Sequence, residues 1–193
     1  MMISESFSCR VFIADFTDYA NRRDAEPVDY RGVVITNEEN GIVPSFVVYN
    51  ENGFPFKIVN NEHNPAFYTR EDGTKVQQCE CIVFADRNDN RRGWMFFLEL
   101  KYCTAKSMYS NMQDGIVQLK ATCKYVFDEK KEYESDQFKR YLVISTPGIE
   151  PLDPFDASYF NQDDILSIKE ETGALLKASN LARIMTPAVV LFD

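Results

Sequence analysis

Histidine is nearly absent from the 193 residues: His63 stands alone, and no serine or cysteine motif accompanies it, so a catalytic triad has no support. The five cysteines make an odd count without disulfide-framework spacing, which favours reduced thiols. No apolar run approaches the length of a membrane-spanning helix. The first ten residues carry Glu5 where a signal peptide would be basic. We therefore expect a soluble, cytoplasmic protein with no membrane partner.

Positive charge is also scarce, because 21 lysines and arginines face 30 acidic residues and leave a net charge of −9. Such a chain does not attract polyanions in general. Residues 87–124 reverse the balance, with seven basic and three acidic side chains. A basic hairpin tip and helix on an acidic body would localise a phosphate backbone. A solvated loop and helix face explains the same pattern nearly as well.

The chain length and its 45% hydrophobic content predict one domain over residues 1–193. Strands are expected over 8–16 and 32–36, followed by two β-rich runs, 45–50 and 54–61. Glu51-Asn52-Gly53 between those two runs is typical of a hairpin turn.

The second half of the chain alternates helices with strands. Apolar residues recur at helical spacing over 107–127, and a strand is expected over 139–146. Residues 149–160 are rich in proline and aspartate and are expected to form a loop. Residues 161–173 and 174–185 are both expected to be helical, before a last strand over 187–193. The fold class is therefore α/β or α+β, with a mixed sheet.

The segment CECIVFADRNDNRRGWMFFLELKYC (79–103) is typical of two antiparallel strands at a sheet centre, because apolar residues occupy both faces. If its polar loop is symmetric, Ile82 lies opposite Phe97 and Glu80 opposite Glu99. Lys101 shares the face of Glu99, since side chains alternate along a strand.

Two opposed carboxylates cost stability unless something positive lies between them. A divalent ion meets this need, since Mg²⁺ binds one or two carboxylates and keeps waters. A lysine nearby suits a metal-bound water and the charge that develops on a phosphate. Glu-x-Lys is a short pattern, and Glu129-Lys130-Lys131 repeats it in a charged linker. An alternative is therefore that Glu99 and Lys101 belong to the end of a strand that emerges into solvent.

An acid on one strand, FFLELK on the next and a glutamine on the following helix resemble the PD-(D/E)XK nucleases of the restriction-endonuclease-like fold, over residues 76 to about 146. The resemblance implies a mixed central sheet flanked by helices and metal-dependent hydrolysis of nucleic acid. Carried over, Glu80 and Glu99 are the metal ligands for Mg²⁺ or Mn²⁺, and Lys101 and Gln118 complete the catalytic set. Nucleic acid is the expected partner, with DNA favoured over RNA, and a homodimer is compatible with the family.

This chain departs from the family pattern in two ways. Cys79-Glu80 replaces the dipeptide Pro-Asp, and no upstream helical glutamate is identifiable. The candidates for that glutamate are Glu38, Glu39 and Glu62. Both departures leave open a fold kept without activity. The alternative function is a catalytically silent nuclease-like domain that binds protein or nucleic acid: the acidic body and the missing Pro-Asp favour it, whereas the intact Glu-x-Lys and Gln118 favour the nuclease.

Two further site assignments stay open. Asp86 fits the loose motif spacing to Glu99, but six residues of strand would place it about 20 Å from the position of Glu80. A thiolate site of Cys79, Cys81 and Cys103 is the other, although buried cysteines more often serve as small apolar residues.

Overall fold

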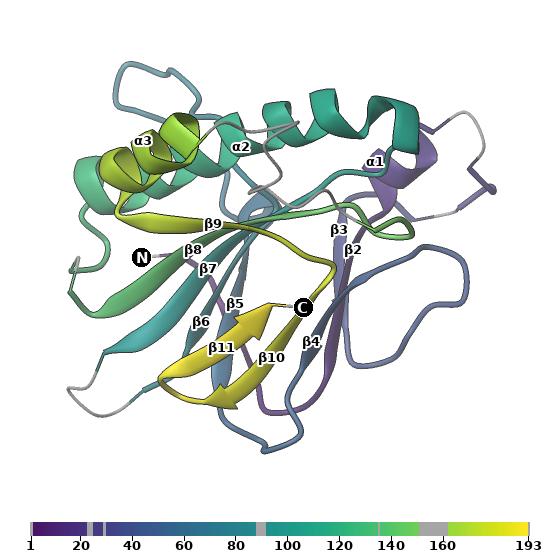
Figure 1. Cartoon of the computed structure of the whole chain (residues 1–193), viewed down its shortest axis with the longest axis horizontal. Coiled ribbons are helices and arrows are strands. Elements are labelled where there is room, and N and C mark those ends of the chain that lie inside the picture. The colour runs from purple at the N-terminus through teal and green to yellow at the C-terminus, as the bar shows by residue number, and fades with distance from the viewer. Residues whose placement is uncertain are drawn as a thin grey trace.

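The computed structural model describes residues 2–22, 25–28, 30–87, 92–134, 136–150 and 162–192. These residues form two mixed sheets and a layer of helices, which confirms the expected mixed α/β class (Figure 1). The helices cover one face of the larger sheet, and the smaller sheet packs on its other face. Parts of the basic hairpin tip and of the loop expected over 149–160 lie outside the described residues.

The larger sheet has six strands in the order β1-β5-β6-β7-β8-β9. Their bounds are Glu5–Phe7 (β1), Phe56–Asn60 (β5), Cys81–Ala85 (β6), Gly93–Leu100 (β7), Phe138–Ser145 (β8) and Ala174–Ala178 (β9). β5, β6 and β7 are antiparallel neighbours, while β7, β8 and β9 run parallel. Parallel neighbours need long crossovers, which helices α2 and α3 provide.

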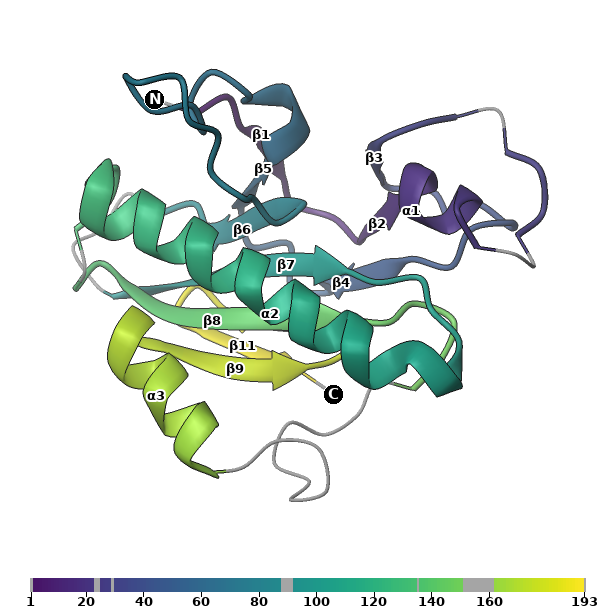
Figure 2. The ribbon, with the colours of Figure 1, turned by 90° about the horizontal axis from the view of Figure 1, so that it is seen from above.

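Helix α2 is the longest in the described chain and crosses the larger sheet, where it packs on β7 and β8 (Figure 2). The helical segments are α1 (Phe16–Ala20), η1 (Asn61–His63), η2 (Ala105–Ser107), α2 (Met108–Lys124), the π-helical η3 (Tyr125–Glu129) and α3 (Gln162–Thr172). In Figure 2, α3 lies on one side of α2, and α1 and the β1–β5 edge lie on the other. Within the described residues, no helix combines the length and apolarity needed to cross a membrane.

The smaller sheet has the order β11-β10-β4-β2-β3. Its strands are Val11–Asp15 (β2), Val33–Thr36 (β3), Phe46–Tyr49 (β4), Leu181–Thr186 (β10) and Val189–Phe192 (β11). The hairpin expected around Glu51-Asn52-Gly53 is wrong, because β4 belongs to this sheet and β5 to the larger one. The turn forms, but it carries the chain between sheets.

The helix expected over 174–185 is also wrong, since these residues form β9 and β10. Gly173, with φ of +65°, ends α3, and Ser179-Asn180 separates the two strands. The spacing of the apolar residues suggested a helix, but hydrogen-bonded pairing of β9 with β8 in the parallel sheet decides the structure of this segment.

Strand β7 is buried along its whole length, because both of its faces are covered. Trp94, Phe96 and Leu98 face the smaller sheet, where the Trp94 Nε1–H donates to the Thr186 carbonyl at 3.1 Å. Met95 and Phe97 face the helices. The sequence of a strand that is buried on both faces is typically a continuous apolar run, so a charged residue such as Glu99 is exceptional in it.

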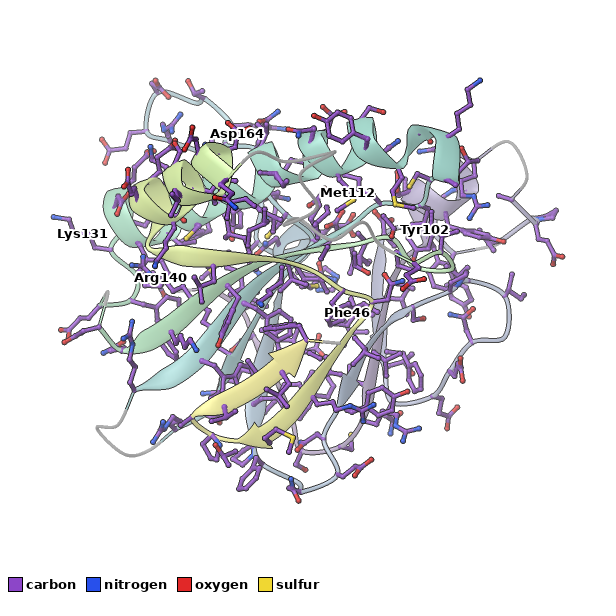
Figure 3. The ribbon with its side chains drawn as sticks, viewed as in Figure 1. Phe46, Tyr102, Met112, Lys131, Arg140 and Asp164 are labelled. Carbon is purple, nitrogen blue, oxygen red and sulfur yellow. The ribbon has the colours of Figure 1, made fainter. Side chains whose placement is uncertain are left out.

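Phe46 joins the two sheets and provides a test of their packing. It is fully buried on β4, and its ring centroid lies 5.9 Å from that of Phe96 on β7 (Figure 3). We expect Phe46→Ala to lower the free energy of unfolding by about 3–5 kcal/mol through loss of apolar burial and the cavity left behind. Urea unfolding followed by the fluorescence of Trp94 measures this. The exposed Ile42→Ala is the control, with an expected change within about 0.5 kcal/mol. A loss in Phe46→Ala as small as that of the control would contradict the packing of the two sheets.

Candidate functional site

The candidate site lies where β6 begins and β7 ends. Ile82 pairs with Phe97 and Cys81 with Leu98, which confirms the predicted register. Glu80 is the residue before β6, and Glu99 is the last but one residue of β7. Side chains on this face of both strands point toward α2, so Glu80, Glu99 and Lys101 come together under the helix.

A chain of short contacts links all four residues of the predicted site. The Glu80 Oε2 accepts a hydrogen bond from the Leu100 N–H at 2.9 Å, and the carboxyl of Glu80 is close enough to Glu99 for the charge of Glu99 to raise its pKa. The Lys101 ammonium pairs with Glu99 Oε1 at 2.5 Å. The same ammonium donates to Gln118 Oε1 at 2.8 Å. The order is therefore carboxyl, carboxylate, ammonium and amide.

Helix α2 can approach this cluster closely because residue 115 is glycine. A Cβ added to Gly115 would overlap the side chain of Ile144 and lie 3.0 Å from Glu99 Cγ and 3.4 Å from Lys101 Cε. Gln118 is one helical turn further along α2, so the close packing at Gly115 brings its amide to Lys101.

Burial governs the protonation of the cluster. Burial raises the pKa of Glu80 well above its usual value, and the charge of Glu99 raises it further. Burial also raises the pKa of Glu99, although the bond from Glu80 and the charge of Lys101 oppose it. Burial would lower the pKa of Lys101, but Glu99 and Glu80 outweigh this and the net pKa is raised. The pKa of Glu80 is therefore raised further than that of Glu99, and Glu99 is the acid that pairs with Lys101.

Glu99 has spare capacity to bind a cation. Its side chain is fully buried, and its Oε2 accepts no hydrogen bond from a backbone or basic donor of the described residues. Two converging carboxylates give hard oxygen ligands that fit Mg²⁺ or Mn²⁺ with several waters. A closed site of three or more histidine, cysteine or acidic ligands is not found in the described chain. The donor set fits a cation held by two carboxylates, not a closed structural site.

Asp18 joins the site and was missed by the sequence analysis. It lies on α1, where its Oδ2 accepts a hydrogen bond from the Tyr102 N–H at 2.9 Å. Burial raises the pKa of Asp18, while the Tyr102 N–H and the nearby charge of Lys101 lower it. Helix α1 has five residues, too few for a periodic pattern. The available signal was Asp15, which is the last residue of the buried strand β2 and the N-cap of α1.

The three glutamates considered upstream do not take this place. Glu62 Oε2 accepts a hydrogen bond from the Val33 N–H at 2.8 Å and so supports β3. Glu38 and Glu39 are exposed in the segment between β3 and β4. The upstream acid whose charge acts on Lys101 is instead Asp18, on a helix that begins directly after β2.

The alternative site residues lie elsewhere. Asp86 follows the end of β6 opposite to Glu80, as the strand spacing predicted. It forms an ion pair with Lys57 at 3.0 Å. Cys81 faces the core between the sheets, whereas Cys79 and Cys103 lie in the core under the helices, so they do not form one thiolate site. Glu129 of the second Glu-x-Lys pattern binds Arg70 on the surface. In the basic segment, Lys120 pairs with Glu171 at 2.8 Å, which fits a solvated helix face.

Comparison of the chain with known protein families, with curated proteins and with solved structures finds no match. The functional assignment therefore rests on the geometry of the cluster.

The raised pKa of Glu80 provides a test of the cluster that needs no metal. A carboxyl whose pKa is raised on folding keeps a proton that the unfolded chain has lost, so stability falls as the pH rises above about 4.3, the ordinary glutamate value. In Glu80→Gln, the introduced amide would accept from the Leu100 N–H and donate to Glu99, as protonated Glu80 does. We expect this variant to be at least as stable as the wild type in EDTA. Its advantage should widen from pH 5 to pH 8.

Urea unfolding at pH 5, 6.5 and 8 measures this difference, with the exposed Glu170→Gln of α3 as the control. A Glu80→Gln protein that loses stability relative to the wild type as the pH rises would show that Glu80 is ionised in the fold.

Proposed function

We propose that this protein hydrolyses phosphodiester bonds of nucleic acid with the help of Mg²⁺ or Mn²⁺. The observation that carries the proposal is the buried carboxylate of Glu99, which faces the carboxyl of Glu80 and is flanked by Lys101. Two acids and a lysine on one face of a central sheet are costly in a purely structural role. Perturbed protonation with specific charge partners is typical of functional sites.

Each residue has a role that follows from its contacts. Glu80 and Glu99 would hold the metal through their carboxylates, with loss of the Glu80 proton on binding. A bound divalent ion would lower the pKa of a water and neutralise charge on the phosphate. Lys101 is placed to hold the attacking water or to stabilise the phosphate in the transition state.

Gln118 and Asp18 act on Lys101 from two sides. The Gln118 amide oxygen fixes the direction of the ammonium, and Gln118 Nε2 lies 3.5 Å from the Gln78 carbonyl. Asp18 contributes a further negative charge near Lys101. If Glu99 bound a metal ion, Gln118 and Asp18 would keep the ammonium in place. Gln118 is therefore a positioning residue, and Asp18 would accept a hydrogen bond from a water on a bound metal ion.

The arrangement supports the resemblance to the PD-(D/E)XK nucleases. Glu80 precedes one strand of a mixed sheet, Glu99 lies near the end of the next strand and Lys101 directly after it, and Gln118 lies on the following helix, which covers the sheet. The aspartate Asp18 offers a counterpart for the upstream helical acid.

A catalytically silent domain that binds protein or nucleic acid is the second candidate. The observation in its favour is that Lys101 already neutralises Glu99, so the cluster is electrically satisfied without metal. In that case the four residues would form a buried polar network that only fixes the packing of α2.

Lys101→Gln separates the two candidates. The introduced amide is one bond shorter than the lysine side chain; it keeps a polar group that can hydrogen-bond near Glu99 and Gln118 but removes the positive charge of the ammonium. We expect cleavage by this variant to fall by about 10²-fold or more, the usual scale for a positioned catalytic group. Its affinity for Mn²⁺ should stay the same or rise, because a competing positive charge is gone. Cleavage assays on DNA and RNA, single- and double-stranded, together with calorimetric titration of Mn²⁺, measure both quantities.

Lys169→Ala, an exposed lysine of α3, is the control for general charge effects. Lys101→Arg should not restore cleavage, because the planar guanidinium cannot occupy the place of the compact ammonium. If the wild type cleaves none of the substrates and binds no Mn²⁺, the silent domain is the correct function.

A further inference from the structure

Two cavities lie beside the cluster, one toward each end of α2. The first, here the α1 cavity, has a volume of about 670 Å³ and is lined by Asp18, Asn21, Arg22, Tyr102, Cys103, Thr104, Ser107 and Asn111. The second, here the glutamine cavity, has a volume of about 340 Å³, and its lining includes Lys75, Gln77, Gln78 and Gln118.

Each cavity is connected to the cluster of Glu80, Glu99 and Lys101 by one lining residue that lies near Lys101. Asp18 of the α1 cavity lies near the Lys101 charge, and Gln118 of the glutamine cavity accepts its hydrogen bond. Asn111 and Gln118 are seven residues apart on α2, which corresponds to about 10.5 Å along the axis. Gly115 lies between them, against Glu99 and Lys101. The order along this face is therefore cavity, cluster, cavity.

The lining of both cavities mixes polar with apolar side chains, since Tyr102 and Cys103 line the α1 cavity and Pro65, Tyr68 and Val76 line the glutamine cavity, and in the α1 cavity the carboxyl of Asp18 stands beside Arg22. Each has one basic residue, Arg22 or Lys75, among hydroxyl and amide groups. Amides and hydroxyls recognise base edges and sugars, and a single cation suits one phosphate. Volumes of this size match those of small-ligand sites, which begin at about 300 Å³. Each cavity is therefore suited to one nucleotide.

A duplex would need a different surface. Duplex binding depends on many lysines and arginines that replace counterions along the backbone. One cation in each cavity and a net charge of −9 do not provide this. A base inside a duplex also cannot enter a concave site unless it leaves the stack.

We infer that the substrate is single-stranded nucleic acid, with one nucleotide in the α1 cavity, one in the glutamine cavity and the scissile phosphate over Lys101 between them. The inference rests on the proposed function, since it takes the cluster as the place of hydrolysis. DNA and RNA share the required phosphodiester chemistry.

Binding of labelled oligonucleotides to the Lys101→Gln protein in Mn²⁺ tests the inference, with DNA and RNA strands of one to six nucleotides. Affinity should rise about tenfold or more from one to three nucleotides, the scale of one added base contact, and then change little. A hairpin-free 12-nucleotide strand should bind about tenfold or more tightly than its 12-base-pair duplex, by the same scale. Equal or tighter binding of the duplex would overturn the inference.

Substitutions in each cavity locate the binding. Arg22→Ala and Lys75→Ala should each weaken binding of the three-nucleotide strand about fivefold or more, the scale of one phosphate contact. Lys169→Ala removes the same charge on α3 and should leave binding unchanged, within about twofold. Equal effects of Lys75→Ala and Lys169→Ala would overturn the placement in the glutamine cavity.

The outcomes for the cluster and for the cavities can be told apart. Length-dependent binding of single strands without cleavage by the wild type would support the two cavities and refute hydrolysis at Lys101. Cleavage by the wild type of duplex but not of single strands would support hydrolysis and refute the inference.

Discussion

The ion pair between Glu99 and Lys101, buried under α2, is the interaction on which the rest of the site depends. Glu99 lies on the helix-facing side of β7, in sequence with Met95 and Phe97. Its charge requires a cation, which Lys101 supplies two residues later, and it raises the pKa of the neighbouring Glu80. Gly115 lets α2 close over the pair, and Gln118 then reaches the ammonium.

The energetics favour a functional reason for this pair. Removing two charges from water costs several kcal/mol per ion, and their attraction rarely returns more than that. Apolar residues at 80, 99 and 101 would continue the core of β6 and β7 without this cost. The two glutamates lie where the sheet meets two cavities that are lined in part by polar side chains, and a mostly apolar interior surrounds them. The buried charges, which cost stability, therefore lie at the place where a ligand can enter.

The sequence was informative where strong local patterns and tertiary structure agree. The two-sided apolar character of 81–85 and 93–100 identified the sheet centre, and the symmetric loop identified the register that brings Glu80 to Glu99. The helix that carries Gln118 was predicted from the helical spacing of the apolar residues over 107–127. Pairing across sheets was not predictable in this way: β4 and β5 are joined by a hairpin-like turn yet enter different sheets, and 174–185 has helical spacing yet forms strands. Asp18 was missed because its contact with Tyr102 spans 84 residues of sequence and its helix is short.

The central claim is that Glu80 and Glu99 together bind a divalent cation, and anomalous diffraction from crystals soaked in Mn²⁺ tests it most directly. We predict one strong anomalous peak within about 2.5 Å of a carboxylate oxygen of each glutamate, close to the distance expected for a hard cation and its oxygen ligands. The Lys101 ammonium should then have moved from Glu99 while it keeps its contact with Gln118. A map with no peak between the two carboxylates at saturating Mn²⁺, and with the Glu99–Lys101 pair unchanged, would contradict the claim.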